Sequence, residues 1–525
     1  MHNPVYRTKP IRQLIKPSFK RAVKASLGVL LGLTLQLGAT TTNAEAIDHL
    51  RMASGLGFNS FDPVFATPQT VDYLRPIYDT LVVRRGMDTF KPGLASSWEY
   101  NDDYTQLTLN LREGLQFTDG EPFNAAAVKA NLERGQAASG SPWAGLYRTI
   151  DRIETPSDYE VVLHLRRPDP TVFEYFSTTP GMMVSPKAME NESELTFNPV
   201  GIGPWKFDGK NSARGDKYAY VANDEYWNPD EQPVNAITIY QMTDPATRVN
   251  ALRSGQLDIA AITQTQGRAL EGLGFTVMPT NMVFYLMGVW DSEGTIVPAL
   301  GDPKVRKAIR LALNRDAILR ALYDGRGRGE VNFYPEGVSG YSEELAKIES
   351  YNLRLARELM EEAGYKDGFD VDVVVQTNNA RIAEALSGEL AKIGVRLDIA
   401  VMPDVGSFHA AVHQKKSPLG IFAHQAALPA GLYNALMSEN GRYNPFGNTH
   451  QDLDALMDEA AQSSEDEAKA LYAKVFNEIA GERALYFPIV QAEILAAMRS
   501  DIEAGAPTYT DAGLPNPRYL SVIND

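Results

Sequence analysis

The chain has 525 residues, of which 44% are hydrophobic and 22% charged, and its formal net charge is −16. This length is too great for one ordinary core and predicts two or three soluble globular domains. Because the excess charge is acidic, nucleic acid is not an expected partner. The sequence contains no cysteine, which excludes disulfides, a thiolate nucleophile, a Cys-ligated metal and a lipid anchor on cysteine.

The first 46 residues have the order of a secretory signal peptide. Seven Lys and Arg residues with no acid lie between Arg7 and Lys24, an apolar run follows over residues 25–39, and residues 44–46 read Ala-Glu-Ala. The apolar run is about 15 residues, shorter than the roughly 20 that a spanning helix needs. Cleavage near Ala46 is therefore favoured over an uncleaved membrane anchor. We expect the protein to diffuse freely in a Gram-negative periplasm.

The first half of the remaining chain is rich in strand patterns. A strand, an irregular stretch and a helix near residues 70–80 are predicted first. Apolar and polar residues then alternate over 106–111, and a hairpin is predicted at 149–154 and 159–165. Between these strands, Asn124 has the position of a helix N-cap, and Gly135 is expected to end that helix.

The second half alternates helices and strands. Asp302 and Pro303 are predicted to begin a helix. A strand over 371–375, a helix over 380–393 and a strand over 395–401 predict a β-α-β unit with parallel strands. Two acidic helices are expected at 451–461 and 465–480.

No enzyme motif stands out. The sequence has no G-x-S-x-G elbow, no P-loop and no HExxH. His409 and His413 are four residues apart on one predicted helix face, but no acid of a zinc protease lies between them. The Gly-Arg alternation at 325–329 is interpreted as a surface turn rather than a phosphate loop, because no helix of the required kind follows it. No catalytic residue, cofactor or metal is predicted, and we expect the protein not to be an enzyme.

A series of segments resembles, in the same order, the family 5 extracellular solute-binding proteins, which are the periplasmic oligopeptide-, dipeptide- and nickel-binding proteins of ABC importers. The segments are residues 92–134, 201–207, 223–227, 245–258, 302–309 and 356–365. The first segment contains no plausible catalytic centre, so it indicates the family without indicating the solute.

The resemblance implies an α/β, two-lobed periplasmic-binding-protein fold of type II, with an additional β-rich domain inserted in the first lobe. Lobe I is predicted to consist of residues 47–85, 199–277 and 487–525, the inserted domain of 86–198, and lobe II of 278–486. The chain is expected to cross between the lobes near 275–281 and 486–490. A solute would then lie between the lobes and be enclosed by hinge closure.

The resemblance also suggests which residues contact the solute. They are Trp143, Thr67, Tyr147, His424, Gln425, Tyr433 and Asn434. Arg442, which follows the loop that contains the last four of these residues, is a further candidate. So is His409, for which a structural or solvent-facing role is the favoured alternative. Trp143 is the strongest candidate, because an indole offers a large apolar face and one donor, although ordinary packing is an equal alternative. Arg442 could bind a carboxylate through its guanidinium, or it could lie on a solvated turn.

The loop from His424 to Tyr433 departs from the family, because peptide-binding relatives hold the peptide ammonium with an aspartate there and this loop has no acid. A peptide held by its N-terminal amine is therefore disfavoured, and the alternative is that Asp404 or Glu439 takes the place of that aspartate. We expect a monomeric receptor that delivers a peptide-like, opine-like or other organic solute to an inner-membrane permease and its ATPase. The alternatives are a carrier of a metal as an organic chelate, through His409, His424 and Arg442, and, remotely, a secreted hydrolase.

Overall fold

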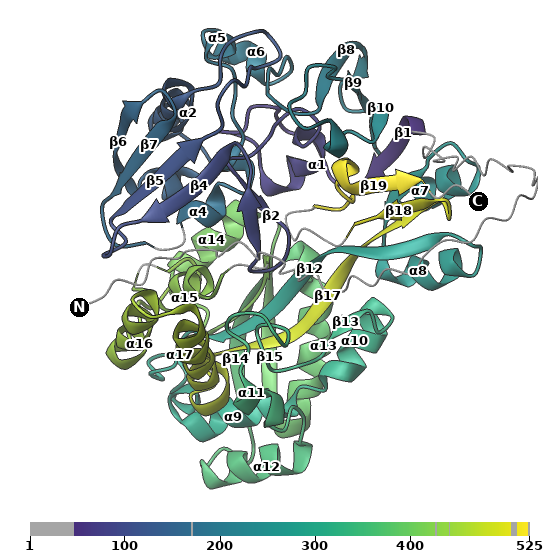
Figure 1. Cartoon of the computed structure of the whole chain (residues 1–525). Coiled ribbons are helices and arrows are strands. Elements are labelled where there is room, and N and C mark those ends of the chain that lie inside the picture. The colour runs from purple at the N-terminus through teal and green to yellow at the C-terminus, as the bar shows by residue number, and fades with distance from the viewer. Residues whose placement is uncertain (1–46, 170–171, 426–427, 440, 506–511, 523–525) are drawn as a thin grey trace, which may run out of the picture.

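The computed structural model describes residues 47–169, 172–425, 428–439, 441–505 and 512–522. It has two lobes, which lie one above the other in Figure 1 and are joined by two long antiparallel strands, β12 (Thr276–Val289) and β17 (Tyr486–Met498). The predicted signal peptide lies outside the described residues. In the described part of the chain, no helix is both long and apolar enough to cross a membrane.

One large mixed sheet runs through both lobes. Its order is β15, β14, β16, β12, β17, β11, β1, β10, β9, β8, and β13 pairs with β17 beside this path. Its other strands are β1 (Ile47–Ser54), β8 (Trp205–Ala213), β9 (Lys217–Ala222), β10 (Val234–Gln241), β11 (Ile259–Ile262), β13 (Gly327–Arg328), β14 (Phe369–Gln376), β15 (Val395–Met402) and β16 (Leu419–Gln425). β18 (Ile502–Ala504) and β19 (Leu520–Val522) form a separate pair.

The predicted β-α-β unit is confirmed in the lower lobe. β14 and β15 pair in parallel, and α13 (Ala380–Leu390) connects them. Gly394 ends this connection with φ of +82°, a left-handed conformation that glycine adopts without a steric penalty. The other helices of this lobe are α9 (Pro303–Ala312), α10 (Arg315–Tyr323), α11 (Glu343–Lys347), α12 (Leu353–Glu362), α14 (Val405–His413), α15 (Pro429–Met437), α16 (Gln451–Ala461) and α17 (Glu465–Asn477).

Two helix predictions were wrong in extent. The helix expected near 70–80 is reduced to α1 (Val71–Leu74), because Pro76 has no N–H to continue it. α17 ends at Asn477 rather than at Ala480. The backbone then continues as a π-type turn over Glu478–Glu482. The remaining helices of the upper lobe beside the large sheet are α7 (Pro245–Arg253) and α8 (Gln264–Glu271).

A separate β-rich domain belongs to the upper lobe. Its four-stranded sheet has the order β4 (Ala95–Tyr100), β5 (Gln106–Leu111), β7 (Glu160–Leu165) and β6 (Ile150–Ser157). Its helices are α2 (Ala125–Ala137), α3 (Ala144–Tyr147), α4 (Val172–Tyr175), α5 (Pro186–Met189) and α6 (Glu192–Leu195). The short hairpin β2 (Val82–Arg84) and β3 (Phe90–Pro92) extends downward from it in Figure 1.

The predicted start of α2 is confirmed, and its predicted end was wrong. Asn124 Oδ1 accepts a hydrogen bond from the Ala127 amide at 3.0 Å, as an N-cap does. Gly135 does not end the helix, which continues to Ala137. Instead, a Cβ at Gly135 would lie 2.4 Å from the Tyr147 ring. Glycine at this position is therefore explained by the packing of Tyr147.

The apolar cores follow this division. One cluster gathers residues between Leu81 and Ile202, and another gathers residues between Leu286 and Val490. β17 contributes Val490 to the lower lobe and Met498 to the upper lobe. The pairing of β12 with β17 shifts register twice, between Pro279 and Asn281 and between Tyr285 and Leu286. These irregularities lie where the strands pass from one lobe to the other.

Candidate ligand-binding site

The irregular segment after β1 is fixed to helix α2 by an ion pair. Two nitrogens of Arg134 donate to the two carboxylate oxygens of Asp62, at 2.8 and 2.7 Å. Both side chains are largely buried, and this two-bond geometry is the strongest that a guanidinium and a carboxylate form. Ser141 Oγ also donates to the Val64 carbonyl at 2.7 Å. Neither Asp62 nor Arg134 was predicted as a site residue from the sequence, because a pair of residues 72 positions apart has no local sequence signal.

The structure brings Trp143 and Thr67 together on this segment. Trp143 Nε1 donates to the carbonyl of Ala66 at 3.0 Å, next to Thr67 in the chain. The amide and hydroxyl of Thr67 lie 3.3 and 3.4 Å from Asn59 Oδ1. Both side chains are half-buried. Because the indole N–H is already engaged, the group that Trp143 can offer to a solute is its ring face.

Tyr147 and Tyr433 lie in cores. Tyr147 is 2% exposed and packs against Gly135 in the β-rich domain. Tyr433 is 3% exposed, and its hydroxyl donates to Asp454 Oδ1 at 2.7 Å. Burial is the largest cause that raises the pKa of both phenols. In this arrangement of the lobes, neither side chain has a surface to offer to a solute.

Three other predicted residues gather around one tyrosine of the lower lobe, Tyr443. The ring of His424, on β16, lies edge-on to Tyr443 at 5.9 Å between centroids. His409, on α14, lies 6.3 Å from the same ring, and the Arg442 guanidinium lies 5.6 Å from its centroid. We call His409, His424, Arg442 and Tyr443 the Tyr443 cluster. Its members come from three separate segments that the fold brings together.

The Tyr443 ring is itself held rigidly. It stacks on Phe422 with 3.9 Å between centroids and 11° between planes, and Phe422 stacks in turn on Trp290. The Tyr486 hydroxyl, at the start of β17, donates to the Tyr443 carbonyl at 2.8 Å. Stacked rings with few rotatable bonds provide a firm base for the polar groups above them.

His409 and Arg442 form a direct pair. Arg442 Nε and Nη2 both donate to His409 Nε2, at 3.1 and 2.9 Å. An imidazole nitrogen can accept only when it carries no proton. Burial, followed by the positive charge of Arg442, lowers the pKa of His409 to about 4. The imidazole is therefore neutral near pH 7, and it orients the guanidinium without cancelling its charge.

Arg442 lies where the two lobes face each other. Burial raises the pKa of Tyr175, at the end of α4 in the upper lobe, and the nearby Arg442 charge opposes this shift. Arg442 is exposed, and no carboxylate of the described residues lies within ion-pair distance of it. It is thus an oriented cation within electrostatic range of the upper lobe, and no carboxylate of the described residues forms an ion pair with it.

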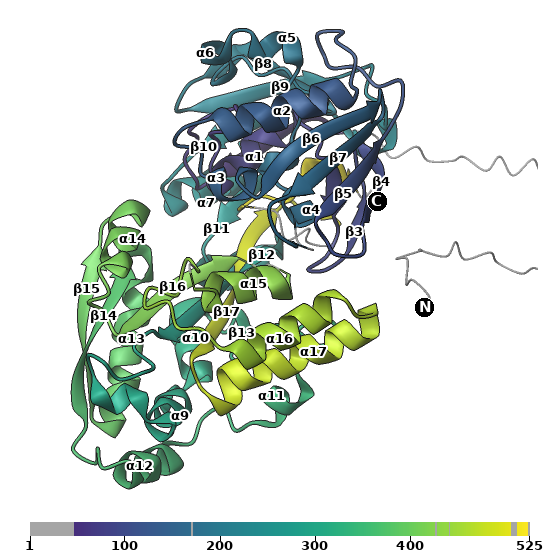
Figure 2. The ribbon, with the colours of Figure 1, turned by 90° about the vertical axis from the view of Figure 1, so that its left-hand side faces the viewer.

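The last two predicted residues lie at the edge of this region. Asn434 is exposed on α15, and its carbonyl accepts a hydrogen bond from Ser438 Oγ. Gln425 ends β16, where its backbone is in register with Val283, and its side chain lies outside what the structure describes. α3, which begins next to Trp143, and α14, which carries His409, lie on the same flank of the molecule in Figure 2.

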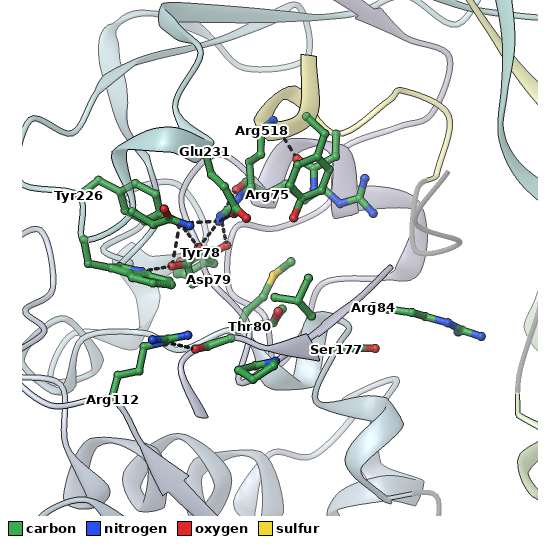
Figure 3. Close-up of a pocket in the computed structure, with 18 of the residues that line it drawn as sticks. Arg75, Tyr78, Asp79, Thr80, Arg84, Arg112, Ser177, Tyr226, Glu231 and Arg518 are labelled. Carbon is green, nitrogen blue, oxygen red and sulfur yellow. Dashed lines mark hydrogen bonds and ion pairs between the residues drawn. The ribbon is translucent and has the colours of Figure 1, made fainter. Parts of the chain in front are cut away.

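A cavity of about 210 Å³ lies within the upper lobe and contains none of the predicted site residues. Figure 3 shows the charged network along one side of it. The buried Asp79 carboxylate accepts from Tyr226 Oη, from Trp227 Nε1 at 2.6 Å and from Arg518. Arg518 also donates at 2.9 Å to the carbonyls of Arg75 and Tyr78. The network ties the carboxyl-terminal segment to the upper lobe.

The two arginines of the Gly-Arg stretch already have carboxylate partners. Arg326, in the Gly-Arg stretch, donates to Glu271 at 2.6 Å, and Arg328 pairs with Glu330. These guanidiniums are therefore engaged, and the stretch contains β13 rather than a surface turn, which corrects that prediction. No group of three His, Cys, Asp or Glu side chains suited to a metal is found within the described ranges.

Two lobes joined by two strands, with polar and aromatic groups where the lobes face each other, define a solute-binding protein. The chain belongs to the family described as bacterial extracellular solute-binding proteins, family 5, whose middle region matches residues 89–443. Proteins of this family serve ABC importers as receptors that deliver solute to the permease.

Among individual relatives, the chain is 28% identical to the glutathione-binding protein GsiB of Escherichia coli K12, over 91% of this chain and 95% of the relative. Two solved structures share its fold. The binding protein DppA from Helicobacter pylori, in complex with the peptide STSA, is 24% identical, with a TM-score of 0.73 over 91% of this chain and 99% of that one. The protein AgaA from A. tumefaciens R10, in complex with agropinic acid, is also 24% identical, with a TM-score of 0.72 and the same coverage.

Proposed function

We propose that the protein is a periplasmic receptor for a small carboxylate-bearing organic solute, peptide-like or opine-like, which binds between the two lobes. The observation that carries the proposal is Arg442, an exposed guanidinium held in place by a neutral imidazole and an aromatic ring. A carboxylate fits such a group well, because parallel N–H donors can meet both of its oxygens.

The acid-free loop before Tyr433 supports the same class of solute. An ammonium group removed from water needs a nearby negative charge, and the residues from His424 to Tyr433 supply none. A solute recognised through its carboxylate does not need this charge. The relatives named above bind glutathione, a peptide and agropinic acid, and all three of these solutes carry carboxylates.

We assign Arg442, His409, His424 and Trp143 to the solute site, with Thr67, Gln425 and Asn434 at its edge, and we exclude the buried Tyr147 and Tyr433. The permease and its ATPase are the proposed partners, and the protein is proposed to be a monomer. It is proposed to reach the periplasm through a signal peptide that is cleaved near Ala46. We also propose the domain division given above. No catalytic role is proposed, because the relatives named above are solute-binding proteins.

The chelate-carrier alternative gains little from these contacts. His409 Nε2 already accepts from Arg442, so this nitrogen would have to give up two hydrogen bonds to ligate a metal. Arg442 could instead bind a carboxylate of the chelator, which is the same recognition as proposed here. Metal analysis of the purified protein separates the two cases.

Native mass spectrometry of protein purified without denaturation tests the proposal, because it identifies any retained solute. Isothermal titration with glutathione, short peptides and opines follows, each compared with a derivative whose carboxylates are amidated. We expect binding of at least one acid and its loss on amidation. Equal affinity for an acid and its amide would contradict the carboxylate assignment, and turnover of a solute would contradict the receptor role.

A further inference from the structure

The two lobes touch at a place apart from β12 and β17. The β2–β3 hairpin and α4 of the upper lobe approach α15 of the lower lobe (Figure 1). Both carboxylate oxygens of Glu174, on α4, accept from the backbone amide of Leu428 at 3.2 Å. Asp88 Oδ2, in the turn between β2 and β3, accepts from the Ser339 amide at 3.1 Å. In both contacts, a carboxylate of the upper lobe meets a backbone donor of the lower lobe.

One arginine organises both carboxylates. Arg84 Nη1 donates to Glu174 Oε1 at 3.1 Å. Its Nε donates to the Gly86 carbonyl at 3.0 Å, and its Nη2 donates to the carbonyl of Met87. The guanidinium thus orients Glu174 directly and also fixes the turn that carries Asp88. Arg84 and Glu174 are both buried, so their geometry is constrained by packing.

Helix α15 has no side-chain cap from its own N-cap residue. The first backbone N–H groups of a helix lack partners within the helix, and a Ser, Thr, Asp or Asn at the N-cap usually accepts from one of them. Here the N-cap is Leu428, which has no side-chain acceptor, and Pro429 follows with no N–H. Glu174 supplies both an acceptor and a negative charge at this end, where the helix dipole favours an anion.

We propose that Arg84, Glu174 and Asp88 form an interlobe latch that stabilises the closed arrangement of the lobes without solute, with Glu174 capping α15 from the opposite lobe. Opening would leave Leu428 and Ser339 to water and would remove the cap from α15. The latch residues are not among those assigned to the solute site. The latch therefore does not depend on which solute binds.

The latch is reversible on energetic grounds. Burial raises the pKa of Glu174, although Arg84 and the Leu428 amide oppose the shift. Burying this carboxylate therefore costs free energy that its contacts offset only in part. Two such contacts can bias an equilibrium between closed and open lobes without preventing solute from entering.

The absence of cysteine allows a direct test, because two introduced cysteines can be labelled uniquely. We suggest Asp102→Cys in the upper lobe and Gln462→Cys in the lower lobe, both exposed positions. Distances between spin labels are measured by pulsed electron paramagnetic resonance in protein shown by native mass spectrometry to be free of solute. Glu174→Gln should lower the ratio of short to long distances about five- to tenfold, since it replaces a charged acceptor by a neutral one.

Asp88→Asn should also lower the ratio of short to long distances, but by a smaller factor. Arg84→Lys should lower this ratio as well, because it should lose both interlobe contacts. Glu190→Gln, an exposed carboxamide substitution in the upper lobe, is the matched control and should leave the distances unchanged. If Glu174→Gln unfolds, Asp88→Asn decides the matter, because Asp88 lies in a half-exposed turn. Wild-type distances in the folded latch variants would overturn the latch, while the carboxylate site of the proposed function would be unaffected.

Discussion

Arg518 and Arg442 both have a guanidinium group, but the surroundings of the two groups differ. Arg518 is 8% exposed, and it donates to Asp79, to Tyr226 Oη and to two backbone carbonyls. Burial works against its charge, but Asp79, together with Tyr226 and Tyr519, more than offsets this, and the pKa of Arg518 is raised. Arg442 is exposed and donates to a neutral imidazole. A charge with a complete set of partners stabilises the fold, whereas a charge oriented by neutral groups stays available for an anionic ligand.

The largest loss of stability is expected when the buried ion pair between Asp79 and Arg518 is broken. Asp79→Ala should leave the Arg518 guanidinium buried without its carboxylate, which typically costs about 3–5 kcal/mol of unfolding free energy. Urea denaturation of the solute-free protein measures this loss. Asp501→Ala is the control, because Asp501 pairs with Arg499 at the surface, where such pairs contribute about 0–1 kcal/mol. Equal losses in the two variants would remove the distinction between the buried and the exposed ion pair.

Arg442→Ala should reduce solute affinity and leave stability nearly unchanged, the opposite of what is expected for Asp79→Ala. We expect the affinity for a carboxylate-bearing solute to fall about 100-fold, since one partner of a charge pair enclosed by the lobes is removed, while the urea midpoint stays close to that of the wild type. Isothermal titration measures the affinity. Arg214→Ala is the matched control, because Arg214 is also exposed and lies over an aromatic ring, Phe197. A loss of stability without a loss of affinity would place Arg442 with Arg518 rather than in the site.

Trp143 tests whether the upper lobe contributes to the same site. Trp143→Ala should weaken binding about tenfold, as expected when one partly enclosed aromatic contact is lost. Trp143→Phe keeps a ring but removes the hydrogen bond to the Ala66 carbonyl, so it separates stacking from the positioning of Thr67. We expect the phenylalanine variant to retain most of the affinity. If both variants bind as tightly as the wild type, Trp143 is a packing residue and does not contact the solute.

Sequence patterns predicted helix ends and turns better than the contacts between residues far apart in the chain. Asn124, Asp302 and Gly394 act where their chemistry requires, because caps and left-handed glycines depend on neighbours in sequence. Gly135 shows the limit of such rules. It resembles a helix end in sequence, but its role is set by Tyr147, a contact between separate elements. The pair of Arg84 and Glu174, which are 90 residues apart, has no sequence signal for the same reason.

In the candidate site, too, the sequence predicted individual residues but not the contacts between them. His409 and Arg442 were both predicted, but nothing in the sequence indicated that they form a pair or that His409 and His424 lie beside the ring of Tyr443. Tyr147 and Tyr433 looked equally suitable as tyrosines near predicted loops, and the structure buries both. Residue type and position along the chain indicate which side chains could bind a solute, whereas exposure and partners separate those that face the opposite lobe from those that pack.

The smallest expected effect concerns the neutral partner of Arg442. The pKa of His409 is about 4 in the folded protein and near 6.5 when the chain is unfolded. Between these two values the unfolded chain binds more protons than the folded one, so this group makes stability rise with pH across that window. Its contribution is complete above about pH 6.5 and is lost as the pH falls through 4. Because the ring is only half-buried, we expect about 1 kcal/mol in total rather than the full value of the shift.

Urea denaturation of wild type and His409→Gln from pH 4 to pH 7.5 measures this contribution. The variant should lose part of the pH dependence, and the remainder includes His450, whose pKa is lowered by burial and by Arg483. His413→Gln, one turn further along α14, is the control and should follow the wild type. Solute affinity should fall only as the pH approaches 4, and in the wild type only, because His409 of the folded protein is protonated there and then no longer accepts from Arg442 and repels it. Parallel curves for wild type and His409→Gln would mean that Arg442 is oriented by Tyr443 alone.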